Sequence, residues 1–138
     1  MKVFGIGIDL VETERIAEVL ERHGERFLEK ILTPEERSYC QRQADPLPHV
    51  AARFAVKEAV AKAFGTGIGA DLGWLDMEIR RDDRGAPHLD LSGAGAEFAR
   101  RMGIVEVKIS LSHVKSCAVA QAMALGEGPG DGAARQPA

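Results

Sequence analysis

The sequence has few aromatic residues and few cysteines, and these two shortages exclude several classes of protein. Aromatic residues make up 5% of the chain, which leaves little material for stacking single-stranded bases. The net charge of −3 argues against a protein that coats nucleic acid or anionic lipid. The two cysteines, Cys40 and Cys117, lack CxxC spacing, so neither a disulfide scaffold nor a structural zinc site is expected.

Long hydrophobic runs are also missing. No stretch of about 18 apolar residues is present to span a bilayer. The first residues are too short an apolar segment for a signal peptide, because Asp9 interrupts them early. We therefore expect a cytoplasmic protein with no membrane partner.

The pattern of apolar residues predicts a single α+β domain with an antiparallel sheet packed against helices. Period-two alternation indicates strands, and caps together with period-3.6 stripes indicate helices. The expected strands are 3–10, 75–80, 88–91, 105–112 and 117–125, and the expected helices are 13–23, 34–45, 48–64 and 93–102. The domain should cover 1–125, and the Gly- and Pro-rich tail 126–138 should be disordered.

The first strand has one face with almost no side chains. Gly5, Gly7 and Asp9 share this face, so another backbone or a ligand can approach it closely. An exposed face of this kind would also favour association with partner subunits. Asp9 itself either begins the next turn or serves as a metal carboxylate on the glycine-lined face.

The helix at 51–64 carries charges in a mostly apolar context. Arg53 and Lys57 are four residues apart, and so are Glu58 and Lys62, so each pair shares a stripe. Such pairs are commonly ion pairs on a solvated face. The rest of the helix is rich in Ala, Val and Phe, which indicates burial. Charged groups on a buried helix need partners or a function.

Two further features are ambiguous from the residues alone. The loop 65–69 follows the helix, so it is either a flexible stop or a place where a ligand lies against bare backbone. His113 ends a predicted strand and is either a partly buried histidine or a binding residue. Neither a Walker lysine pattern nor a GxSxG elbow is present.

Three blocks occur in an order that resembles one family, the holo-[acyl-carrier-protein] synthases, which are small bacterial 4′-phosphopantetheinyl transferases. The resemblance covers about residues 3–125. The blocks are GIGIDLVE at 5–12, RFAVKEA followed by KAFGTGIG at 53–69, and ISLSH at 109–113. The middle block is the most specific of the three.

The resemblance implies a function and a set of site residues. Family members transfer 4′-phosphopantetheine from coenzyme A to a carrier-protein serine, release adenosine 3′,5′-bisphosphate, and form homotrimers with active sites between subunits. Asp9 and Glu58 match the family's Mg²⁺ ligands, and Lys62 matches its phosphate-side lysine. Either Glu58 or a metal-bound water beside it would accept the serine proton. The segments that match the coenzyme A wall contain Arg53, Gly65, Thr66, Ser110 and His113.

The partner implied by the resemblance is apo acyl carrier protein. Arg15 and Arg26 match the family's carrier-docking arginines, although glutamates surround both and a solvated face is the other interpretation. Two rival functions remain at this stage. The same chemistry could serve a polyketide or peptide synthase carrier, or the chain could be a non-catalytic trimeric scaffold that binds coenzyme A.

Overall fold

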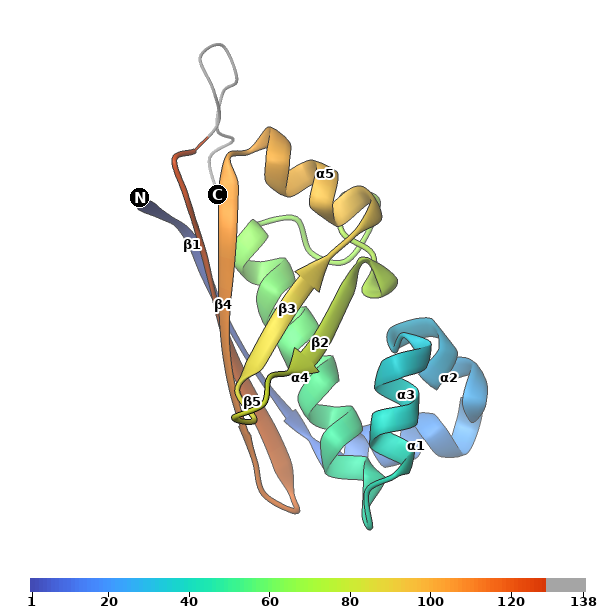
Figure 1. The fold of residues 1–138 in the computed structure, drawn as a ribbon. Helices are drawn as coiled ribbons and strands as arrows, with labels where there is room; N and C mark the ends of the chain where they lie inside the picture. Colours follow the sequence, from blue (N-terminus) through green and yellow to red (C-terminus); the bar gives the residue numbers. More distant parts are fainter. Residues whose placement is uncertain (129–138) are drawn as a thin grey trace.

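The computed structural model describes residues 1–128 as one α+β fold. The elements run β1 (Lys2–Glu12), α1 (Thr13–His23), α2 (Glu25–Ile31), α3 (Pro34–Gln41), α4 (Pro46–Phe64), a 3-10 turn (Trp74–Asp76), β2 (Met77–Arg81), β3 (Pro87–Leu91), α5 (Gly93–Arg101), β4 (Ile104–His113) and β5 (Cys117–Gly126). An antiparallel sheet of order β1-β5-β4 lies against α4, and β2 and β3 form a separate hairpin (Figure 1). The expected fold class is confirmed.

Helix α4 lies unusually close to the sheet because both surfaces carry small residues. A Cβ atom built on Gly7 would overlap the carbonyl oxygen of Ala59, and one built on Gly5 would overlap that of Ala63. The alanines of β5 that face α4 are also fully buried. The glycine-lined face of β1 is therefore covered by a helix of the same chain. It is not exposed, so our use of it as a sign of partner subunits was wrong.

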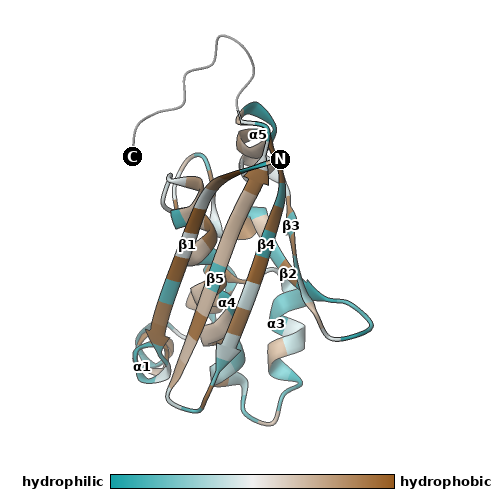
Figure 2. Cartoon of the chain, turned by 90° about the vertical axis from the view of Figure 1, so that its left-hand side faces the viewer, coloured by the Kyte–Doolittle hydropathy of each residue, from teal (hydrophilic) through white to brown (hydrophobic). Residues whose placement is uncertain are grey.

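The opposite face of the three-stranded sheet has no helix over it among residues 1–128. Figure 2 looks onto this outer face, with α4 behind the strands. On β1 the outer side chains are apolar yet well exposed: Ile6 and Ile8 are each 62% exposed and Leu10 is 68% exposed. Exposed apolar patches of this kind on a soluble protein mark interaction surfaces.

The boundary between α3 and α4 differs from the prediction because of proline chemistry. The Thr33–Glu36 capping box starts α3 as expected, but the helix ends at Gln41. Helix α4 then begins at Pro46, capped by the side chain of Asp45. A proline in the first turn lacks only an N–H that would be unbonded anyway. Proline there therefore permits the earlier start.

Helix α2 was not predicted. It has only seven residues and follows α1 after the single residue Gly24, whose φ of 58° redirects the chain. So short a helix gives little periodic signal. Its Phe27 and Leu28 pack against the core, so tertiary contacts stabilise it.

The remaining sequence expectations concern membranes and the tail. Within residues 1–128, no helix has the length and apolarity needed to cross a bilayer. Strand β5 extends through Gly126, and the Glu127 amide donates to the Gly103 carbonyl. The rest of the expected disordered tail, 129–138, lies outside the described residues.

Candidate functional site

The fold brings together three of the predicted site residues beside β1. Asp9 lies on the face of β1 that packs against α4, and Glu58 and Lys62 occupy successive turns of that helix. The Lys62 Nζ donates to Asp9 Oδ1 at 3.1 Å and to the Ile8 carbonyl oxygen at 2.9 Å. The Asp9 side chain is 16% exposed, whereas that of Lys62 is 53% exposed. We call Asp9, Glu58 and Lys62 the carboxylate–lysine group.

Electrostatics make this group suited to a cation. The pKa of Glu58 is raised, first by burial and then by the nearby Asp9 carboxylate, while Lys62 opposes the shift. A divalent cation between two carboxylates offsets the electrostatic repulsion between them. Mg²⁺ is commonly held by one or two carboxylates, with waters and substrate phosphates completing its shell. No cluster of three or more potential ligands occurs in residues 1–128.

A pocket of about 250 Å³ opens beside the carboxylate–lysine group. Its polar lining comes from Asp9, Glu58 and Arg15. The rest of the lining is apolar and comes from β1, α1, α2 and α4: Leu10, Val11, Ile16, Val19, Phe27 and Phe54. Arg15 thus faces the same hollow as the carboxylates. Arg26 is exposed on α2 and does not line it.

A second group forms around Arg53 and His113. The Arg53 side chain is buried, with its guanidinium 4.2 Å from the centre of the Tyr39 ring, and its Nη1 donates to the His49 carbonyl oxygen at 3.3 Å. The His49 ring lies 5.0 Å from that of His113, edge to face. Burial lowers the pKa of His49, and the neighbouring side chains of His113, Arg53 and Arg81 lower it further. We call Arg53, His49, His113 and Tyr39 the histidine group.

The carboxylate–lysine group and the histidine group lie on different sides of one chain. Arg53 and Glu58 are five residues apart on α4, which places their side chains about 140° apart around the helix. Asp9 and His113 belong to β1 and β4, the two edges of the β1-β5-β4 sheet. A single chain therefore does not unite all the predicted residues at one site.

Three more predicted residues take up separate positions. Gly65 ends α4 in the left-handed region, with a φ of 76°, three residues beyond Lys62. The Thr66 hydroxyl donates to the Gly67 carbonyl oxygen. Ser110 pairs with Gln121, and its side chain lies on the outer face of the sheet. The His113 side chain lies on the other face of β4, toward α4.

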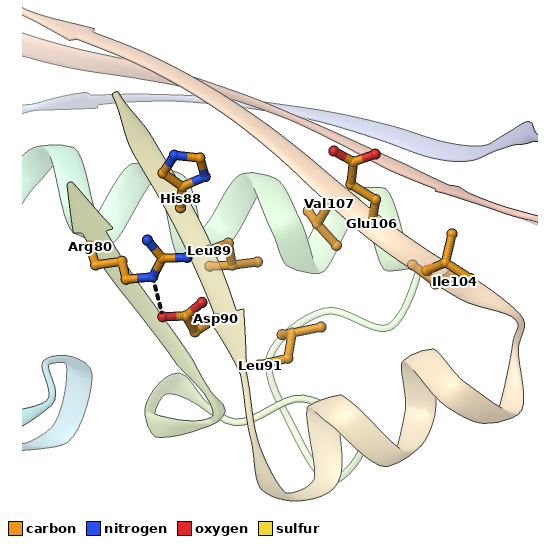
Figure 3. A pocket seen from close by; sticks show the side chains of 9 residues that line it. Arg80, His88, Leu89, Asp90, Leu91, Ile104, Glu106 and Val107 are labelled. Atoms are coloured by element: carbon orange, nitrogen blue, oxygen red, sulfur yellow. Dashed lines mark hydrogen bonds and ion pairs between the residues drawn. The ribbon is translucent and has the colours of Figure 1, made fainter. Parts of the chain in front are cut away.

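A second pocket, of about 370 Å³, lies between β3 and β4 (Figure 3). Arg80, His88 and Asp90 line it from the hairpin, and Glu106 lines it from β4. The Arg80 Nε donates to Asp90 Oδ2 at 2.8 Å. Strands β3 and β4 are neighbours but do not belong to the same sheet. The pocket therefore separates the hairpin from the edge of the main sheet.

The sequence pattern placed Lys57 on a buried helix, where a charge needs a partner, but it did not identify that partner. Lys57 is fully buried, and its Nζ donates to Glu36 Oε1 and to the Ile31 carbonyl oxygen, each at 2.6 Å. The ion pair with Glu36 therefore accounts for the charge of Lys57 on the buried helix α4 as part of the fold. His49 was also missed, because a histidine near the start of a helix carries no signal of a ring 64 residues away in the sequence. Only the strand-to-helix packing reveals that contact.

Known proteins resemble this chain over nearly its whole length. A sequence profile of the 4′-phosphopantetheinyl transferase superfamily matches residues 5–120. The holo-[acyl-carrier-protein] synthase of Ruminiclostridium cellulolyticum is 44% identical over 119 residues, which cover 86% of this chain and 89% of that protein.

Solved structures agree. The crystal structure of the Neisseria meningitidis holo-[acyl-carrier-protein] synthase superposes with a TM-score of 0.85 at 34% identity, covering 90% of this chain and 99% of the other. The Helicobacter pylori holo-[acyl-carrier-protein] synthase, solved in complex with coenzyme A, gives a TM-score of 0.76 at 34% identity, covering 87% and 99%.

Proposed function

The chain belongs to the 4′-phosphopantetheinyl transferase superfamily, and we propose that it transfers 4′-phosphopantetheine from coenzyme A to a serine of apo acyl carrier protein. The products are holo carrier protein and adenosine 3′,5′-bisphosphate. Coenzyme A is the bound ligand in the solved Helicobacter pylori relative. Within this chain, the observation that carries the proposal is the contact of Lys62 with Asp9, one helical turn from Glu58.

Asp9 and Glu58 would hold Mg²⁺ in this proposal. Burial raises the pKa of Glu58 and the nearby Asp9 carboxylate raises it further, which supports a cation at this place. When bound, the ion supplies charge neutralisation on the pyrophosphate oxygens of the donor. The chain's task is then positioning, because phosphoryl transfer depends on in-line geometry and electrostatics more than on covalent help from the protein.

Lys62 would stabilise the negative charge of the leaving group, and Glu58 would take part in removing the proton of the carrier serine. The Lys62 ammonium, half exposed beside Asp9, can leave the Ile8 carbonyl and steady negative charge on the departing bisphosphate. The carrier serine must lose a proton as it attacks the phosphorus. Glu58, or a water that it holds, would accept this proton, since a carboxylate with a raised pKa is a stronger base.

The full site would form between copies in a homotrimer. The carboxylate–lysine group and the histidine group face different sides of one chain, so a neighbouring copy can bring the two groups together. The exposed apolar side chains of Ile6, Ile8 and Leu10 on the outer face offer a surface for that association. Coenzyme A would then lie between the carboxylate–lysine group with Gly65 and Thr66, and the neighbour's Arg53, Ser110 and His113.

The carrier protein would dock beside the pocket next to α1. Arg15 lines that pocket, and Arg26 is exposed on the adjoining helix α2. Two arginines near the reacting group suit an acidic carrier surface. We propose that the reaction takes place in the cytoplasm.

Release of adenosine 3′,5′-bisphosphate tests the activity. The purified chain, incubated with coenzyme A and Mg²⁺, should release the bisphosphate only when an apo carrier is added. The Glu58→Gln variant serves as the control, because it keeps the side chain's shape and removes its charge. Release without a carrier, or no release with any apo carrier, would contradict the proposal.

A mixing experiment tests the shared site. Glu58→Gln and Arg53→Gln each disable a different group, so each variant alone should be nearly inactive. Co-refolded mixtures would place an intact carboxylate–lysine group of one copy against an intact histidine group of another. Activity should therefore reappear in the mixture. Mixtures no more active than the parent variants would mean that each chain works alone.

A further inference from the structure

The histidine group is an unusually basic part of the molecule. Its His49 and Arg53 come from α4 and its His113 from the end of β4, and Arg81, at the end of β2, lies near enough to act on His49. The acidic group that acts on His49 is Asp45, which caps the start of α4. The Tyr39 ring, from α3, packs against both the His49 ring and the Arg53 guanidinium. Four basic side chains therefore converge from three elements.

Two buried nitrogen atoms in this group have no hydrogen-bond partner within residues 1–128. They are the Nε of Arg53 and the Nδ1 of His49. The Arg53 side chain is only 3% exposed, so its unpaired Nε–H is costly in the free protein. A buried Arg53 N–H without an acceptor, in a positively charged setting, is able to donate to an anion.

The donor's phosphates can be divided between the two groups. On the proposed function, the pyrophosphate of coenzyme A lies at the carboxylate–lysine group, where bond breaking occurs. The remaining phosphate is the monoester that the bisphosphate product retains at its 3′ position. The histidine group, with Arg81 beside it, offers basic side chains for this phosphate. A phosphate monoester is a dianion near neutral pH and binds well to paired N–H donors.

We propose that His49 is the proton-responsive member of this group: it is neutral in the free protein and takes up a proton when the 3′-phosphate binds beside Arg53 and His113. This inference rests on the proposed function. In the free protein, burial and the neighbouring His113, Arg53 and Arg81 side chains disfavour a proton on His49. The negative charge of a bound phosphate dianion stabilises the protonated imidazolium of His49 and so favours that proton. As the pH falls, the wild type should therefore bind coenzyme A increasingly more tightly than a variant without an ionisable side chain at position 49.

The experiment measures the dissociation constant of coenzyme A, in the presence of Mg²⁺, from about pH 8 to about pH 6. The variants are His49→Gln, which keeps a neutral donor, and His49→Phe, which keeps a ring against His113. The matched control is His23→Gln, an exposed histidine on α1. Circular dichroism and thermal melting establish that each variant is folded.

The phosphate's own titration does not confuse the comparison. A phosphate monoester protonates near pH 6, which weakens binding at low pH equally in the wild type and in the variants. The wild type should bind coenzyme A on the order of threefold to tenfold more tightly than His49→Gln at about pH 6, and the two should converge at about pH 8. His23→Gln should follow the wild type.

A second ligand identifies the phosphate involved. With 3′-dephospho-coenzyme A, the wild type and both His49 variants should show the same pH dependence. If coenzyme A binds but its pH dependence is identical in wild type and both variants, the role of His49 is refuted and the proposed function stands. If the His49-dependent difference persists with the dephosphorylated ligand, the assignment to the 3′-phosphate is refuted. A failure of coenzyme A to bind at any pH overturns the proposed function as well.

Discussion

Replacing Lys57 should destabilise the fold far more than replacing an exposed lysine or arginine would. The Lys57 side chain is fully buried, and its ammonium is bound to the Glu36 carboxylate and to the Ile31 carbonyl at 2.6 Å each. Glu36 also accepts hydrogen bonds from the Thr33 and Ile79 amides, so one carboxylate links α3, α4 and β2. Lys57→Met fills a similar volume but leaves that buried carboxylate without its cation.

The magnitude follows from breaking one side of a buried pair. Such changes cost about 3–5 kcal/mol, because an uncompensated charge remains in the interior. For a chain of this size, that corresponds to a fall in Tm on the order of 10–20 °C. The double variant Glu36→Gln/Lys57→Met removes both charges and should recover part of the loss. Urea unfolding followed by circular dichroism, at one fixed protein concentration, measures the free energies of unfolding.

Arg80→Met is the matched control. The Arg80 and Asp90 side chains are paired at 2.8 Å but are 54% and 52% exposed, so the pair should contribute less than about 1 kcal/mol. The reasoning is refuted if Lys57→Met costs no more than Arg80→Met. It is also refuted if the double variant is as unstable as the sum of its two single changes.

Other parts of the structure give three further predictions. Gly7→Ala should lower the free energy of unfolding by at least about 2 kcal/mol, because the added methyl group pushes α4 away from the sheet. Gly69 has open space around it, so Gly69→Ala should change the free energy of unfolding by less than about 0.5 kcal/mol. Equal effects of the two substitutions would contradict the close packing of α4 on β1. Asp9→Asn should weaken the apparent Mg²⁺ affinity, and excess Mg²⁺ should restore part of its rate. Glu58→Gln should lose on the order of 10²–10⁴ in rate, and excess Mg²⁺ should restore little of it. Full recovery of the Glu58→Gln rate by excess Mg²⁺ would exclude Glu58 as the base. Burial and the neighbouring His113 and Arg53 lower the pKa of His49 on folding, so its contribution to stability is present above the unfolded pKa of about 6.5 and is lost as the pH falls from there through the lower folded pKa. His49→Gln should flatten that part of the stability profile, and an unchanged profile would contradict a neutral, half-buried imidazole.

Much of the fold followed from local signals. The capping box at Thr33 and Glu36, the alternation along β4, the apolar run of β5, and the turn between β2 and β3 are short-range patterns, and each predicted its element. Gly5 and Gly7 predicted a close approach to the first strand, and α4 provides it. The sequence did not reveal which backbone approaches, because that depends on contacts more than fifty residues apart.

The site was predicted unevenly for the same reason. Asp9, Glu58 and Lys62 were expected to act together, and they do lie side by side. Arg53 and His113 were expected on the same wall, and the structure joins them through His49, a residue without any local signal. Ser110 points from the other face of β4. Spacing along one helix or strand predicts which residues share a face, but not which faces meet in space.

The most direct test of the central claim is the mass of a carrier protein. Purified apo acyl carrier protein should be incubated with the chain, coenzyme A and Mg²⁺, and then analysed intact by mass spectrometry. The account predicts that the carrier gains one 4′-phosphopantetheinyl group on a single serine, and that a carrier in which this serine is replaced by alanine gains none. An unmodified apo carrier, under conditions where the chain is folded and binds coenzyme A, would contradict the assignment of this site as a transferase.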